Sequence, residues 1–136
     1  MKMKREQVYE LYMALSRMGD VSVMKTAYAI AKTMSSIRTE AEFFENQRNR
    51  LLKKYGKEEK GNLSISMDNP NWPDFAREYA ELASEEIEVE IHQVDATMED
   101  FMAEGVKAKD YSLVMMYLVL PPSADESKNK GEVLSE

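Results

Sequence analysis

The chain has 136 residues, a formal net charge of −7 and no cysteine. This length is enough to bury a core without cross-links, and the lack of cysteine excludes disulfides, a thiolate nucleophile and cysteine-based metal sites. The longest apolar run, Leu113 to Leu120, is far shorter than the ~18 residues of a membrane span, so we expect no membrane partner.

Further expectations concern location and domain organisation. The first residues contain no apolar signal-peptide core, and with the missing cysteines this favours a cytoplasmic protein. We expect a single globular domain over residues 1–120 and a disordered, acidic and polar tail over 121–136. Residues 1–62 carry a net charge of +5 from 13 basic and 8 acidic side chains, whereas residues 63–136 carry −12 from 5 and 17. The acidic total argues against a nucleic-acid partner.

The first predicted element is an amphipathic helix over residues 2–18. Its apolar side chains follow a 3-4-3 spacing and are Val8, Leu11, Leu15 and Met18. Gly19 and Asp20 end this helix, and Ser22 is a plausible N-cap for the next one. A connection this short predicts an antiparallel pair of helices.

The chain is organised around one long helix predicted from Val21 to Tyr55. Its apolar positions follow the 4-3 spacing of a helix that packs along a partner, and they are Val23, Ala27, Ile30, Met34, Ile37, Ala41, Phe44, Leu51 and Tyr55. Arg48 occupies the one missing position, and Gly56 is a stop. Such a helix is roughly 50 Å long. The first helix covers only part of it, so its distal half needs other segments or a second copy of the chain.

The next elements predict that distal partner. Residues 63–67 alternate as a short strand, and residues 73–84 form a helix with proline at its first position. Residues 85–94 are the clearest strand, with Ile87, Val89 and Ile91 on one face. We expect the two strands to pair in a small sheet that packs on the distal half of the long helix. The predicted fold class is therefore α+β and mainly helical.

Two further segments complete the domain. A short helix is predicted near residues 98–104, after residues 95–97 at its N-terminus. The apolar segment 110–120 can be a buried helix or a strand, and Asp110 as a possible N-cap favours the helix.

Three segments carry a resemblance to a known family. Residues 27–32 read AYAIAK, residues 44–56 read Phe-x-x-x-Arg-x-x-Leu-x-x-Lys-Tyr-Gly, and residues 88–92 read EVEIH. In this order, over residues 11–95, they resemble a family of small uncharacterised proteins from tailed bacteriophages and prophages of Gram-positive bacteria. The resemblance implies a phage origin and a bacterial host cell, possible association with phage particles, and no catalytic residue or cofactor.

The residues themselves offer little chemistry for an enzyme. His92 is the only histidine, which excludes a histidine-based metal cluster, and neither a nucleophile elbow nor a glycine-rich phosphate loop is present. Glu86, Glu88 and Glu90 on one strand face could hold Mg²⁺ or Ca²⁺, but such a face is more often solvated. We therefore expect no enzyme activity, no cofactor and no metal.

The leading hypothesis is a non-enzymatic interaction or assembly protein of phage origin that self-associates through the long helix. Its partner would be itself or another phage or host protein. The candidate interface residues are Tyr28, Lys32, Phe44, Arg48, Leu51 and Tyr55. Tyr28 and Lys32 form either a binding patch or a half-buried tyrosine beside a solvated lysine. The alternative function is a small acidic inhibitor of a host protein, a host-takeover or anti-defence factor that could imitate DNA.

Overall fold

The computed structural model describes residues 1–103 and 105–120. They form two compact units. Unit 1 comprises Met1–Met13 and Ser35–Glu90, and unit 2 comprises Ala14–Met34 with the chain from Ile91 onward. The predicted tail, residues 121–136, lies outside the described residues.

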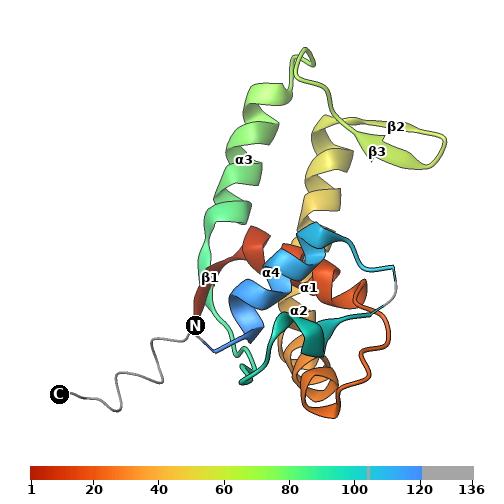
Figure 1. The fold of residues 1–136 in the computed structure, drawn as a ribbon. Helices are drawn as coiled ribbons and strands as arrows, with labels where there is room; N and C mark the ends of the chain where they lie inside the picture. Colours follow the sequence, from red (N-terminus) through yellow and green to blue (C-terminus); the bar gives the residue numbers. More distant parts are fainter. Residues whose placement is uncertain (104, 121–136) are drawn as a thin grey trace. The chain divides into compact units, whose positions relative to one another are not determined.

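The fold class is confirmed as α+β and mainly helical (Figure 1). The elements in chain order are β1 (Lys2–Lys4), α1 (Arg5–Ser16), α2 (Met24–Tyr55), β2 (Lys57–Glu59), β3 (Asn62–Ser64), α3 (Trp72–Ser84), β4 (Glu86–Glu88), the 3-10 helix η1 (Met98–Phe101) and α4 (Ala108–Leu118). Helices α1 and α2 each contribute residues to both units. Among the described residues, no helix combines the length and apolar character needed to cross a bilayer.

The long helix α2 begins at Met24, three residues later than predicted, so Ser22 is not its N-cap. It ends at Tyr55, as predicted. The physical reason for Gly56 is steric. A Cβ atom at Gly56 would lie 2.2 Å from the backbone oxygen of Ser64, so only glycine lets β3 pass this close to the helix end.

The partner of the distal half of α2 is helix α3, and the predicted packing of a sheet there is wrong. The Asn71 side chain donates a hydrogen bond to the Tyr55 carbonyl at 3.2 Å. Further along, the rings of Phe44 and Tyr79 meet edge to face at 6.1 Å. The N-terminus of α3 therefore lies near the C-terminus of α2, and the two helices run antiparallel within unit 1 (Figure 1).

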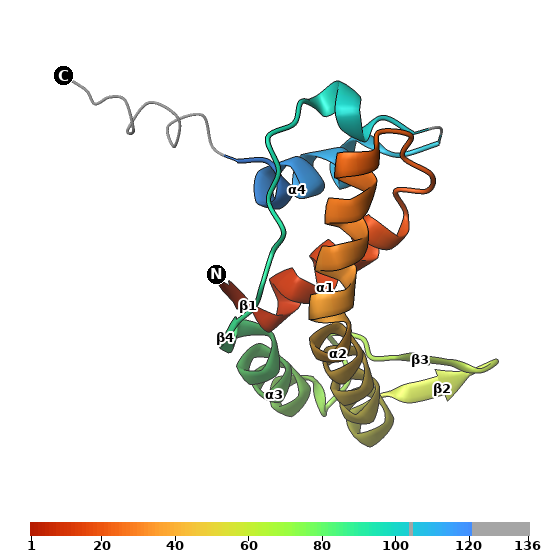
Figure 2. The same ribbon diagram turned by 90° about the horizontal axis from the view of Figure 1, so that it is seen from below.

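The strands pair differently from the prediction, which joined residues 63–67 to 85–94. Strand β4 pairs antiparallel with β1, with Met3 opposite Ile87, and β3 pairs with β2. Strand β1 comprises residues that were predicted to be helical, and β2 lies between the predicted long helix and the predicted strand at residues 63–67, where no element was predicted. Lys60 and Gly61 both have positive φ between β2 and β3, as a tight two-residue hairpin turn requires. The hairpin extends away from α2 and α3 (Figure 2).

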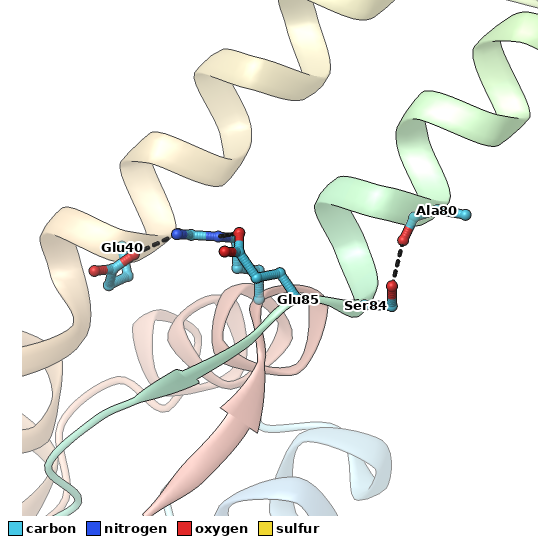
Figure 3. A network of polar contacts seen from close by, with 5 residues as sticks. Glu40, Ala80, Ser84 and Glu85 are labelled. Atoms are coloured by element: carbon cyan, nitrogen blue, oxygen red, sulfur yellow. Dashed lines mark hydrogen bonds and ion pairs between the residues drawn. The ribbon is translucent and has the colours of Figure 1, made fainter.

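A network of ion pairs in unit 1 joins Arg5, at the start of α1, to Glu40 on α2 and to Glu85, the C-cap residue of α3. Arg5 donates hydrogen bonds to Glu40 at 2.5 Å and to Glu85 at 2.9 Å (Figure 3). Its guanidinium also lies 4.7 Å from the centre of the Phe43 ring. Burial alone would lower the pKa of Arg5, but the hydrogen bonds to the two carboxylates outweigh burial and raise this pKa above its usual value.

The core of unit 1 gathers apolar side chains from three helices and the short sheet: Met3, Val8, Leu11, Ile37, Ala41, Phe44, Phe75, Ala83 and Val89. In unit 2 the core residues are Ala14, Leu15, Met18, Ala29, Ile30, Val94, Phe101, Tyr111, Val114 and Leu118. The apolar segment 110–120 is mainly helical, as favoured, but its helix α4 begins at Ala108. Asp110 is therefore in the first turn and is not the N-cap.

The predicted strand 85–94 is also shorter than expected, since only Glu86–Glu88 form β4. Within unit 2, Val94 makes an isolated parallel bridge to Val119. Its amide donates to the Leu118 carbonyl at 2.8 Å, and the Leu120 amide donates to the Val94 carbonyl at 3.0 Å. These two bonds fix the chain that leaves α4 against the segment that follows β4.

Candidate interaction surfaces

One side of α2 in unit 2 is apolar and open. Met24 is 80 % exposed and Tyr28 is 54 % exposed, Ala31 is exposed, and Ala27 and Met34 are half-buried. We call these five residues the α2 apolar face. They recur every three or four positions, which places them on one side of the helix. The opposite side carries Thr26, Ala29, Ile30 and Thr33, all buried. A helix that is buried on one side and exposes an apolar stripe on the other usually has a second partner.

A hollow of about 450 Å³ lies along this face. It is formed by the end of α1, the connection to α2 and α2 itself. Its lining is mostly apolar and comprises Leu15, Ser16, Gly19, Asp20, Val21, Ala27, Ile30, Ala31 and Met34. Gly19 has φ +70°, a conformation that favours glycine, and no atom lies within 4 Å of where its Cβ would be. A hollow of this size and chemistry can receive an apolar side chain from another molecule.

The buried side of α2 is covered by the segment after Ile91. The backbone amide of His92 donates to the Thr33 hydroxyl at 2.9 Å, and the Thr26 hydroxyl donates to the Asp100 carbonyl at 2.7 Å. Lys25 Nζ donates to the Asp95 carbonyl at 2.8 Å. These hydrogen bonds pair backbone groups of the segment after Ile91 that no strand pairs. The segment therefore already covers this side of α2 within unit 2.

The predicted pair Tyr28 and Lys32 lies at the edge of the α2 apolar face, and both residues are exposed. The Tyr28 ring also meets the imidazole of His92 edge to face, with ring centres 5.2 Å apart. No group of three or more histidine and carboxylate side chains in the described part of the chain is arranged to hold a metal ion.

The other four predicted interface residues lie in unit 1, where Phe44, Arg48 and Tyr55 contact residues of the same chain. Phe44 is 1 % exposed, and its ring lies 5.1 Å from that of Tyr9. The Arg48 guanidinium lies 5.1 Å from the centre of the Tyr9 ring. The aromatic residues Tyr9 of α1 and Tyr79 of α3 cover this part of α2.

Leu51 and Tyr55 are half-buried near the distal end of α2. The Tyr55 hydroxyl donates a hydrogen bond to the Glu78 carboxylate, and Lys54 Nζ lies 3.6 Å from the same group. The hydrogen bond from Tyr55, with the nearby charge of Lys54, lowers the pKa of Glu78. These contacts bind α2 to α3 and give Tyr55 a partner within the chain.

Sequence reasoning missed Met24 and Ala31 as surface residues. The signal was present as a second stripe of uncharged residues, each one position after an apolar position of the predicted 4-3 pattern. Methionines also gather near a second hollow in unit 2, of about 390 Å³, which is lined by Met98, Val106, Ala108, Tyr111, Ser112 and Met115. The Tyr111 hydroxyl bonds to the backbone amide and carbonyl of Ala103, at 2.9 and 3.1 Å, and so closes one wall of that hollow.

Comparisons of the chain with protein-family models, with curated proteins and with solved structures found no match.

Proposed function

We propose that this protein acts by binding another protein chain through the α2 apolar face, as a non-enzymatic interaction or assembly protein. The observation that supports the proposal is the open apolar side of α2 beside a hollow of about 450 Å³. Exposed apolar surface of this kind is costly in water and is typical of binding sites. Exposed methionine suits this role because its flexible side chain adapts to a partner.

The resemblance to phage and prophage proteins, drawn from residues 11–95, is the ground for proposing that the protein is phage-encoded and acts in an infected bacterial cell. Under this proposal its partner is another copy of the chain, another phage protein or a host protein. Capture on the immobilised protein from host lysate, with and without phage infection, reveals which partners bind only during infection.

Paired variants on one helix test the proposal. Met24→Lys combined with Tyr28→Lys places two charges on the α2 apolar face. Glu42→Lys with Glu45→Lys is the matched control, since both glutamates are exposed on the distal half of α2. We expect the first variant to lose self-association and captured partners by ten-fold or more, while the control keeps them. Circular dichroism verifies that both remain folded. An unchanged set of interactions in the Met24/Tyr28 variant contradicts the proposal.

The acidic-inhibitor alternative has its own supporting observation. Glu86, Glu88 and Glu90 are all exposed, and residues two apart on an extended chain lie about 7 Å from each other on one face. A protein that imitates DNA would use such a row of carboxylates to bind a basic host protein. Replacing the three glutamates by glutamine would then abolish partner capture and its salt dependence, whereas substitutions on the α2 apolar face would leave capture intact.

A further inference from the structure

The redox chemistry of sulfur in this chain belongs to its methionines. The chain has 11 methionines and no cysteine, so the thioether is its only oxidisable sulfur group. Peroxides convert methionine to methionine sulfoxide, which is polar and chiral. The oxidant must reach the sulfur atom, so the exposure of each methionine predicts how readily it reacts.

The methionines differ widely in exposure. Met24 is the most exposed at 80 %, followed by Met67 at 77 % and Met116 at 69 %, whereas Met3 and Met18 are fully buried in the cores. Oxidation of a core methionine disrupts packing, because it places a polar oxygen among apolar side chains. A limited amount of oxidant therefore modifies the three most exposed thioethers and leaves both cores intact.

Of these three methionines, Met24 alone belongs to the α2 apolar face. It is the first residue of α2, one turn before Tyr28, which is exposed as well. Met67 follows strand β3 in unit 1, and Met116 lies on α4. Met34, the other methionine of the α2 apolar face, is half-buried beside the hollow. The most readily oxidised sulfur of the chain therefore lies on the proposed binding surface.

Oxidation changes the chemistry of that surface. A thioether is apolar and flexible, which suits it to pack against a partner, whereas a sulfoxide oxygen is a hydrogen-bond acceptor. A partner that covers the oxidised Met24 has to remove this oxygen from water. Burial of a polar group without a hydrogen bond costs free energy, so the oxidised face binds more weakly.

We propose that Met24 is a reversible oxidation site that regulates binding at the α2 apolar face. A lone pair of the Met24 sulfur attacks one oxygen of hydrogen peroxide, the O–O bond breaks, an S–O bond forms, and water leaves. The sulfur gives up two electrons, and the peroxide takes them up. Methionine sulfoxide reductases, one for each epimer, reverse the step with electrons from a dithiol. This inference rests on the proposed function and names the regulation of its binding surface.

Titration with hydrogen peroxide, followed by peptide mass spectrometry, tests the site itself. We expect sulfoxide to form at Met24, Met67 and Met116 well before Met3 and Met18 react, because the last two are buried. Circular dichroism of the partly oxidised chain should match that of the untreated chain. A Met24 that reacts no faster than the two buried methionines overturns the proposal.

Capture of proteins from lysate of infected host cells measures the consequence for binding. The partly oxidised parent chain should capture ten-fold less than the untreated parent, and treatment with both reductases should restore capture. Each variant is compared with its own untreated sample, so that the effect of leucine itself cancels. Peroxide should leave capture by Met24→Leu unchanged, whereas Met67→Leu, the matched control, should stay as sensitive to peroxide as the parent.

The outcomes separate the two proposals. If the variant with lysine at positions 24 and 28 loses the captured proteins but complete oxidation of Met24 does not, only the oxidation site is overturned and the proposed function stands. A loss of capture on oxidation that persists in Met24→Leu also overturns the site, because another methionine is then responsible. A parent chain that captures no protein overturns both proposals.

Discussion

The two halves of α2 have the same apolar spacing but different surroundings. In unit 1 the distal half places Phe44 among Tyr9 and Tyr79, and its outward positions carry residues such as Glu42, Glu45 and Asn49. In unit 2 the first half is apolar on its outward side as well. The 4-3 spacing of apolar residues is the same in both halves of α2. The residues on the outward side therefore distinguish a half with a solvated face from a half with a further partner.

The largest expected effect comes from a substitution in the distal half of α2, which α1 and α3 cover. Phe44→Ala removes a fully buried ring and should lower the free energy of unfolding by about 3–5 kcal/mol. Its neighbour Phe43 is 43 % exposed, so Phe43→Ala is the matched control and should cost about 1 kcal/mol or less. Urea unfolding measures both. Equal losses for the two variants would show that the ring contacts of Phe44 with α1 and α3 do not form.

The next largest effect concerns an ion pair in unit 2 that has one buried partner. Asp110 is 2 % exposed and accepts a hydrogen bond from Arg17, which is 47 % exposed, at 3.1 Å. Arg17→Met leaves a buried carboxylate without this partner and should cost about 2–3 kcal/mol. Asp110→Asn leaves an arginine that water can solvate, so we expect a smaller loss.

The ion pair is tested by comparing how much free energy of unfolding each of the two variants loses. Urea unfolding of Arg17→Met and Asp110→Asn measures these losses, with Lys109→Met as an exposed control. A larger loss in Asp110→Asn than in Arg17→Met would contradict the asymmetric burial of the two side chains.

The sequence predicted the elements with strong local signals. The uninterrupted 4-3 spacing predicted α2, and the proline at the first helical position predicted α3 close to its true bounds. Burial of Phe44 also followed from that spacing. For the surface, Tyr28 was singled out and is exposed, while Met24 and Ala31 were missed because only one stripe of the helix was considered.

The strands could not be predicted in the same way. Strand β1 has one inward residue, Met3, and three residues cannot distinguish a strand from the start of a helix. Its partner β4 lies more than 80 residues away, so a long-range contact and not local preference decides the pairing. Strand β2 is entirely charged, and it forms because Lys60 and Gly61 adopt the hairpin turn.

A smaller effect concerns Arg48, whose guanidinium lies over the Tyr9 ring. Such a contact at a half-exposed site contributes about 0.5–1 kcal/mol. We expect Arg48→Leu to keep the fold and change the free energy of unfolding by no more than about this amount, since leucine replaces the lost contact by apolar packing. Sedimentation equilibrium should show the parent mass, because the α2 apolar face, the proposed binding surface, lies in the other half of α2. A changed mass would place Arg48 in the interface.

The smallest effect is a pH dependence at the distal end of α2. The hydrogen bond from Tyr55 and the charge of Lys54 hold the pKa of Glu78 below its usual value. A carboxyl whose pKa is lower in the folded chain than in the unfolded chain stabilises the fold above the unfolded pKa, about 4.3. That contribution is lost as the pH falls through the folded pKa.

Glu78→Gln keeps an acceptor for Tyr55 but removes the charge. We therefore expect the variant to be slightly less stable than the parent at pH 6–7, and the difference to shrink below about pH 4. Thermal melts across this range, with the exposed Glu81→Gln as control, measure it. A difference that does not change with pH would mean that the charge of Glu78 contributes nothing to holding α3 against α2.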